Sequence, residues 1–219
     1  MNKKKNLTVK EIFALAVQNH QKNNLKVAKN LYKEILKVNP NYANAHNNLG
    51  IIFEQLEDSQ KAIFHFRKAI EINSNYGDAY YNLGRMFNEL NKFQEAINCY
   101  ERVIQINPKH ADVYNNLGLI FKNLGKHQKA INCYGKAIQN DSKYVNAYNN
   151  LGTILGELNY VNEAKNNFEK SLNLNPNEKK TCEGYGNILL KLNQHDKALA
   201  YIKKGTGFII FTQKDFNII

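Results

Sequence analysis

Residues 115–118 read Asn-Asn-Leu-Gly, and the same four residues stand at 47–50 and at 149–152. Their glycines belong to a longer series at intervals of 34 residues: Gly50, Gly84, Gly118, Gly152 and Gly186. A fixed period of about 20–50 residues is typical of a repeat array, and a period of this length accommodates two helices with their turns. The series therefore predicts stacked helix–turn–helix units, whose function usually lies on a long surface.

Other positions recur with the glycines. Alanine stands 12 residues after each of them, and a large residue stands 16 residues after each. The alanines are Ala62, Ala96, Ala130, Ala164 and Ala198, and the large residues are Phe66, Tyr100, Tyr134, Phe168 and Ile202. Ala16 replaces the glycine in a degenerate first repeat. Because alanine rarely adopts positive φ, this position requires a small residue and not a left-handed backbone. We expect the small residues to lie where the two helices of a repeat cross closely.

Helix boundaries are also marked in the sequence. Thr8 and Glu11 have the spacing of a capping box and predict a helix that begins at Val9. The three prolines, Pro40, Pro108 and Pro176, share one phase of the period. Because proline cannot continue a helix, we expect each of them to follow the end of a second helix.

The recurring Leu, Gly, Ala and aromatic positions resemble those of the tetratricopeptide repeat family over about residues 9–204. The resemblance implies an all-α fold, an α-α superhelix (right-handed solenoid) of about six repeats whose first helices line a concave groove. The expected boundaries are a basic lead at 1–8, repeats at 9–42 (degenerate), 43–76, 77–110, 111–144, 145–178 and 179–204 (incomplete), and a non-repeat tail at 205–219.

Composition limits the classes of protein to consider. The chain has 219 residues, 43% of them hydrophobic, with three cysteines and a formal net charge of +11. No apolar run approaches the roughly 18 residues of a membrane span, and three cysteines cannot form a disulfide framework. We therefore expect a cytoplasmic globular protein. The excess of positive charge lies near the chain ends, as at Lys3, Lys4 and Lys5, and is typical of a solvated tail.

The charges expected on the groove are of the opposite sign. First-helix positions that point away from the predicted core carry five acids and two bases, which gives about −3. The acids are Glu54, Asp78, Glu89, Asp112 and Glu157, and the bases are Arg85 and Lys122. A nucleic-acid partner is therefore disfavoured. A neutral or mildly basic polypeptide fits better, with Asp78, Arg85 and Asp112 as candidate contacts.

Asparagines recur along the same face. Asn48, Asn82, Asn116 and Asn150 share one phase and predict a ladder, with Asn47, Asn115 and Asn149 beside it. A carboxamide both donates and accepts hydrogen bonds, so each rung can pair with a peptide backbone. The Asn-Asn-Leu-Gly runs resemble the repeat region of O-linked N-acetylglucosamine transferases, a resemblance that implies peptide binding by the rung asparagines. Ala14 and Gly184 end the ladder. The alternative is that asparagine is merely common at this phase.

Other kinds of site find little support. The residues at the phases of a chaperone-tail carboxylate clamp are Phe13, Val17, Asn47, Ile51, Asp78 and Asn82, where basic residues would be needed. Cys99 and Cys133 occupy equivalent positions in two Ile-Asn-Cys-Tyr runs and are expected to pack inside second helices. No zinc-ligand spacing, phosphate loop or nucleophile motif occurs, so we expect no metal, no cofactor and no catalytic residue.

Two functional hypotheses follow. The first is a protein–protein interaction scaffold that binds an extended polypeptide in the concave groove. The alternative is a non-catalytic recruiting arm of a larger enzyme, such as an O-GlcNAc-type glycosyltransferase, because the repeat pattern breaks at Gly205-Thr206-Gly207 without a polar final helix. The apolar run Phe208-Ile209-Ile210-Phe211 and the last repeat also make self-association possible.

Overall fold

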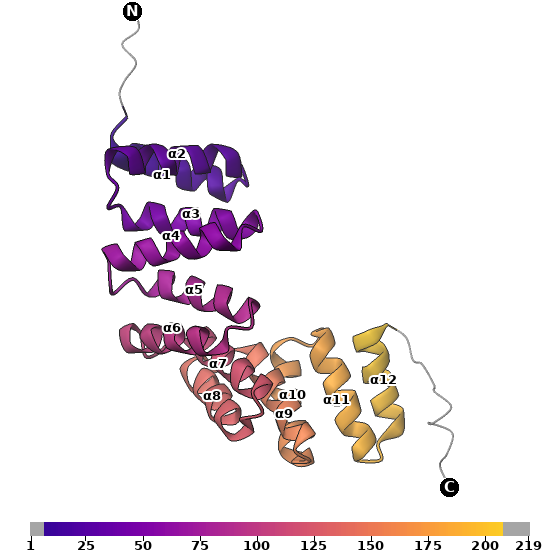
Figure 1. Cartoon of the computed structure of the whole chain (residues 1–219). Helices are drawn as coiled ribbons and strands as arrows, with labels where there is room; N and C mark the ends of the chain where they lie inside the picture. The colour runs from indigo at the N-terminus through magenta and orange to yellow at the C-terminus, as the bar shows by residue number, and fades with distance from the viewer. Residues whose placement is uncertain (1–6, 208–219) are drawn as a thin grey trace, which may run out of the picture. The chain divides into compact units, whose positions relative to one another are not determined.

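The computed structural model describes residues 7–207, which form twelve α-helices and no strand (Figure 1). The predicted all-α class is therefore confirmed. Contacts divide the chain into two compact units, one up to Pro108 and one from Lys109. The helices of the first unit are α1 Val9–Gln21, α2 Leu25–Val38, α3 Ala43–Gln55, α4 Ser59–Ile72, α5 Gly77–Glu89 and α6 Phe93–Ile106. Those of the second unit are α7 Ala111–Asn123, α8 His127–Asn140, α9 Val145–Glu157, α10 Val161–Leu174, α11 Lys179–Lys191 and α12 His195–Thr206.

Consecutive helices form pairs, and within each unit each pair packs on the next (Figure 1). Odd-numbered helices are the first helices of the repeats, and even-numbered helices are the second. Each of the first five pairs falls inside one of the expected 34-residue repeats, and the sixth pair extends past the expected end at 204 to Thr206. The repeat boundaries themselves remain a prediction. No helix within residues 7–207 is long and apolar enough to cross a membrane.

The glycine series marks close crossings between the two helices of a repeat, as predicted. A Cβ atom at Gly50 would lie 2.5 Å from Cε1 of Phe66, and one at Gly84 would lie 2.8 Å from Cε1 of Tyr100. Both rings are completely buried. The glycines are therefore needed because an aromatic ring of the second helix occupies the space that a side chain would take.

Side-chain hydrogen bonds that were not predicted from the sequence stabilise the turns between repeats. An asparagine or aspartate follows each of four second helices, and its Oδ1 accepts a hydrogen bond from the backbone N–H two residues later. The pairs are Asn39 with Asn41 at 3.2 Å, Asn73 with Asn75 at 3.1 Å, Asp141 with Lys143 at 2.9 Å and Asn175 with Asn177 at 3.3 Å. The same turn forms where serine replaces proline, at Ser74 and Ser142, so proline is not required for it.

The turn inside each repeat contains one residue with positive φ. These residues are Asn23, Glu57, Asn91, Gly125, Asn159 and Asn193, with φ between 56° and 68°. Glycine and asparagine adopt this left-handed conformation at low cost, whereas other residues are strained in it by about 1–2 kcal/mol. Glu57 is the one residue at these six equivalent positions that is neither glycine nor asparagine.

Glu57→Asn is expected to raise the free energy of unfolding by about 1 kcal/mol, because asparagine relieves this strain. Urea denaturation of the variant beside the unchanged protein measures the effect. The reciprocal variant Asn91→Glu places the same strain at an equivalent turn and should lower the free energy by a similar amount. Equal stability of the two variants would contradict the assignment.

The expected break of the pattern at Gly205 is wrong. Helix α12 continues to Thr206, and Gly207 caps it with φ 82°. A Cβ atom at Gly205 would lie 2.7 Å from both the Glu183 nitrogen and the Lys179 oxygen. Gly205 is thus a close contact between α11 and α12 and belongs to the last repeat. Phe208-Ile209-Ile210-Phe211 lies outside the described residues.

Candidate functional site

In the first unit, the predicted rung Asn48 lies on α3 and faces α2. Its Nδ2 donates a hydrogen bond to the Tyr32 hydroxyl at 3.0 Å. Asn48 also lines a shallow hollow of about 330 Å³ on the first-helix face, together with side chains of both hydrophobic and polar character: Val17, His20, Gln21, Tyr32, Ile51 and Gln55. The Asn48 side chain is half-buried, so it is partly accessible from this hollow.

The second rung, Asn82 on α5, is held by the preceding repeat. Its Nδ2 donates to Oδ1 of Asn47 on α3 at 3.1 Å. Asn47 itself is only 4% exposed, so its prediction as a surface contact is wrong. The residue lies beneath Asn82 and orients it. The periodicity of a single helix places Asn47 at the edge of the core. Its burial depends on Asn82 of the following repeat, which lies against it.

The second unit repeats this arrangement. Nδ2 of Asn150 on α9 donates to Oδ1 of Asn115 on α7 at 2.8 Å. Asn115 is 5% exposed and is therefore also a buried support and not a surface contact. Asn116 is half-buried on α7. Asn149 is half-buried too, and its Oδ1 is buried without a hydrogen-bond partner among residues 7–207.

Hydrogen bonding leaves part of each carboxamide available. Oδ1 of Asn82 and Oδ1 of Asn150 accept no hydrogen bond from residues 7–207. A carboxamide has two donors and one acceptor oxygen, so each of these side chains keeps one N–H and its Oδ1 after the bond to the preceding repeat. The arrangement is a fixed polar group that can both donate and accept.

The predicted charged contacts are mostly paired within the chain. The Arg85 guanidinium bonds to Glu54 and lies 3.8 Å from Glu89. Burial raises the pKa of Glu54, while the neighbouring Arg85 opposes that shift. Arg85 therefore interacts with two carboxylates of its own unit. Its charge is less available to a partner protein than the sequence alone predicted.

In the second unit, Nζ of Lys122 lies 2.7 Å from Oε1 of Glu157. Oδ1 of Asp112 accepts a hydrogen bond from the Tyr144 hydroxyl at 2.7 Å. Asp78, in the first turn of α5, is exposed. Four of the five acids counted from the sequence thus have a partner within their own unit: Glu54, Glu89, Asp112 and Glu157.

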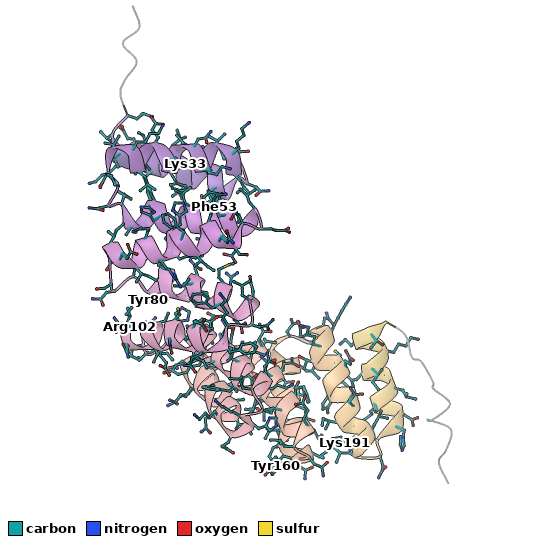
Figure 2. The ribbon with its side chains drawn as sticks, in the orientation of Figure 1. Lys33, Phe53, Tyr80, Arg102, Tyr160 and Lys191 are labelled. Carbon is teal, nitrogen blue, oxygen red and sulfur yellow. The ribbon has the colours of Figure 1, made fainter. Side chains whose placement is uncertain are left out.

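Basic residues of the second helices lie over aromatic rings of the first helices. Arg102 lies 5.7 Å from the centroid of the Tyr80 ring (Figure 2). Lys136 lies 5.5 Å from the Tyr114 centroid, and Lys170 lies 5.7 Å from the Tyr148 centroid. These cation–π contacts recur every 34 residues. The period of the bases in the sequence could have revealed them.

The potential metal ligands and the cysteines lie as follows in the described part of the chain. Residues 7–207 contain no group of three or more His, Cys, Asp or Glu side chains placed to hold a metal ion. Cys99 is buried, Cys133 is half-buried and neither forms a disulfide. Burial raises the pKa of Cys99 to about 11, which suits the packing role expected for it.

The sequence matches models of one repeat family along most of its length. Models described as "Tetratricopeptide repeat" match residues 43–76, 65–98, 111–144, 145–178 and 180–207, and one described as "TPR repeat" matches 84–125. No curated protein sequence matches the chain. The narrower resemblance to the repeat region of O-linked N-acetylglucosamine transferases remains a prediction.

Solved structures share the fold. One is described as "Crystal structure of MamA", with 29% identity and a TM-score of 0.68 over 73% of this chain and 93% of that chain. PilW, "widely conserved type IV pilus biogenesis factor", has 16% identity and a TM-score of 0.80 over 96% and 97%. YrrB, "a TPR protein with an unusual peptide-binding site", has 19% identity and a TM-score of 0.65 over 80% and 91%. The chain belongs to the tetratricopeptide repeat family.

Proposed function

We propose that the protein is a non-catalytic scaffold that binds an extended polypeptide along the first-helix faces of its repeats. The observation that carries this proposal is the state of Asn82 and Asn150. Each is tethered to the preceding repeat by one N–H and presents Oδ1 without a partner among residues 7–207. The peptide-binding site named for the similar YrrB structure is in keeping with such a role.

The backbone of a bound peptide supplies the matching groups. An extended chain presents alternating N–H and C=O groups and rises about 3.3 Å per residue. Packed helices lie about 8–10 Å apart, so successive rungs of a unit would meet roughly every third residue of the peptide. Recognition through the backbone tolerates different side chains. The proposed site consists of Asn48 and Asn82 in the first unit and Asn116 and Asn150 in the second.

Tethering favours binding for a physical reason. An exposed asparagine loses rotamer freedom when it bonds to a ligand, and that loss weakens association. Asn82 and Asn150 are already held by Asn47 and Asn115, so a peptide meets side chains that are in place. The buried asparagines therefore act as positioning residues.

Replacing all four rungs, Asn48, Asn82, Asn116 and Asn150, with alanine is expected to weaken peptide binding at least about tenfold, because the bonds to the peptide backbone are lost. Dodecapeptides selected from a random library on the unchanged protein provide the ligands, and their affinities are measured by fluorescence anisotropy. Circular dichroism checks that the variant keeps its helices.

A matched control is present on the second helices. Asn30, Asn98, Asn132 and Asn166 also share one phase, and all four are exposed. Their replacement by alanine changes the composition equally and should leave the affinities unchanged. Selected peptides that bind the rung variant as tightly as this control variant would disprove the proposed site.

A further inference from the structure

The hollow beside the rung Asn48 lies between α1 and α3 in the first unit, and Tyr32 of α2 contributes to it. Its volume is about 330 Å³. Val17 of α1 and Ile51 of α3 supply aliphatic surface, and both side chains are half-buried. Each of them therefore keeps some apolar surface in contact with water, and a bound apolar group would cover that surface.

The polar side chains of the hollow are largely paired with one another. The Tyr32 hydroxyl accepts a hydrogen bond from Nδ2 of Asn48 at 3.0 Å. Nε2 of His20 lies 3.1 Å from Oε1 of Gln55, which joins α1 to α3. No acidic residue, lysine or arginine is among the residues that line the hollow. An apolar group can therefore enter without separating an ion pair, and the buried hydroxyl already has a partner.

The aliphatic character of this hollow is specific to the first two repeats. Val17 and Ile51 share one phase of the period, and the residues at this phase in the later repeats are Arg85, Leu119, Thr153 and Asn187. No other two consecutive repeats are both aliphatic at this phase. Between α3 and α5 of the same unit, the position is occupied by Arg85, which bonds to Glu54. The corresponding surface there is charged, whereas the hollow between α1 and α3 is not.

We infer that this hollow binds one aliphatic side chain, such as that of leucine, from the polypeptide partner. The inference rests on the proposed function, because it assigns a side-chain specificity to the site of Asn48. Asn48 lines the hollow, and after its bond to Tyr32 it keeps a second N–H that can donate to a peptide carbonyl. Successive side chains of an extended peptide point to opposite sides. A residue next to the bonded carbonyl therefore directs its side chain into the hollow, while its neighbours point away.

Solvation disfavours the other classes of side chain. A lysine, arginine, aspartate or glutamate would lose water in the hollow without meeting a residue of opposite charge. An asparagine is close to leucine in size, but it would give up hydrogen bonds to water against the aliphatic surfaces of Val17 and Ile51. An uncharged side chain without polar atoms is therefore the best match.

Two nine-residue peptides test this inference with the full chain. Both alternate serine with alanine and are capped at both ends, and the central residue is leucine in one and asparagine in the other. The leucine peptide is expected to bind about tenfold more tightly, because its side chain covers apolar surface. NMR titration measures the two affinities from the methyl resonances of Val17 and Ile51. Nuclear Overhauser effects should connect the leucine methyl groups to both residues.

Variants of the two aliphatic residues probe the hollow itself. Ile51→Asn removes one aliphatic wall and should abolish the preference for leucine. Asn187 occupies the same phase in the last repeat, so the array accommodates asparagine there. Val17→Thr keeps the shape of the side chain, exchanges a methyl group for a hydroxyl, and should reduce the preference. Leu119→Asn makes the matched change at the same phase of the second unit and should leave the preference unchanged.

Three results would overturn the inference. They are equal affinity of the two peptides, a leucine side chain without nuclear Overhauser effects to Val17 and Ile51, and an undiminished preference in Ile51→Asn. Circular dichroism checks that each variant keeps its helices. Val17→Thr provides the same test if Ile51→Asn does not fold.

The rung variant separates this inference from the proposed function, because it keeps Val17 and Ile51. If both are correct, the rung variant binds both peptides more weakly and preserves the ratio of their affinities. Equal binding of the two peptides that is lost in the rung variant overturns the hollow and supports the rungs. A preference for leucine with undiminished affinity in the rung variant supports the hollow and overturns the rungs. Absence of binding by both peptides overturns both.

Discussion

Gly118→Ala is expected to lower the free energy of unfolding by about 1–3 kcal/mol, the usual effect of an overpacked core. The new Cβ atom would collide with Cε1 of Tyr134 and would lie 2.6 Å from its Cδ1. The Tyr134 ring is completely buried, so it cannot turn out into solvent without disturbing the core around it. Urea denaturation followed by circular dichroism measures the change.

The neighbouring helix offers a matched control for this prediction. Gly135 lies in α8, and a Cβ atom there would meet nothing within 4 Å. Gly135→Ala should therefore raise the free energy of unfolding by up to about 1 kcal/mol, since alanine favours the helix over glycine. Combining Gly118→Ala with Tyr134→Leu should recover part of the loss, because the ring is the obstacle. Equal effects at Gly118 and Gly135 would contradict the crossing argument.

Acid is expected to destabilise the second repeat between about pH 6.5 and pH 4. Burial lowers the pKa of His65 to about 4, and His46 and Lys33 add unfavourable positive charge. His65 Nδ1 lies 3.0 Å from His46 Nδ1, and the His65 ring stacks on Phe53 at a centroid distance of 5.4 Å. Burial lowers the pKa of His46 as well.

The sign of the effect follows from proton binding. The pKa values of both histidines are lower in the folded state than in the unfolded state, so the unfolded chain binds more protons in this range. The stabilisation is complete above the ordinary histidine pKa of 6.5 and is lost as the pH falls toward the folded-state value of about 4. One pKa unit corresponds to about 1.4 kcal/mol. Because His65 is partly exposed and screened by solvent, we expect a loss of about 1–2 kcal/mol.

His65→Gln should flatten this part of the stability curve, because glutamine does not titrate and still bonds to His46. Urea denaturation at half-unit pH intervals gives the comparison. His127→Gln on α8 is a matched control, because it makes the same substitution at an exposed position. An unaltered pH dependence in His65→Gln would exclude the histidine pair as its source.

The helix crossings were predictable because a glycine, an alanine and a large residue, such as Gly118, Ala130 and Tyr134, recur together at a fixed spacing. The ends of α2, α6 and α10 were predictable from Pro40, Pro108 and Pro176. The strain at Glu57 could not be predicted from that residue alone, because glutamate gives no sign of positive φ. A comparison of the repeats would have indicated it, because asparagine stands at the equivalent position of four other repeats.

The candidate site was less predictable than the fold. The rung positions follow from the period, whereas the burial of Asn115 depends on Asn150, which lies above it in the next repeat. Periodicity within one helix cannot detect this cover. The pairing of Arg85 with Glu54 is hidden for the same reason, because residues on different helices decide which charges remain accessible.

The bonds between residues 35 positions apart have a consequence for how the gene could change length. Asn47 with Asn82 and Asn115 with Asn150 are separated by one period plus one residue. An in-frame duplication of residues 111–144 would supply a new copy of Asn115 and Asn116 beside the old ones. The second copy of Asn116 would meet the first copy of Asn115, and Asn150 would meet the second copy of Asn115. Duplication of a whole repeat therefore extends the array without any compensating substitution at the asparagine positions.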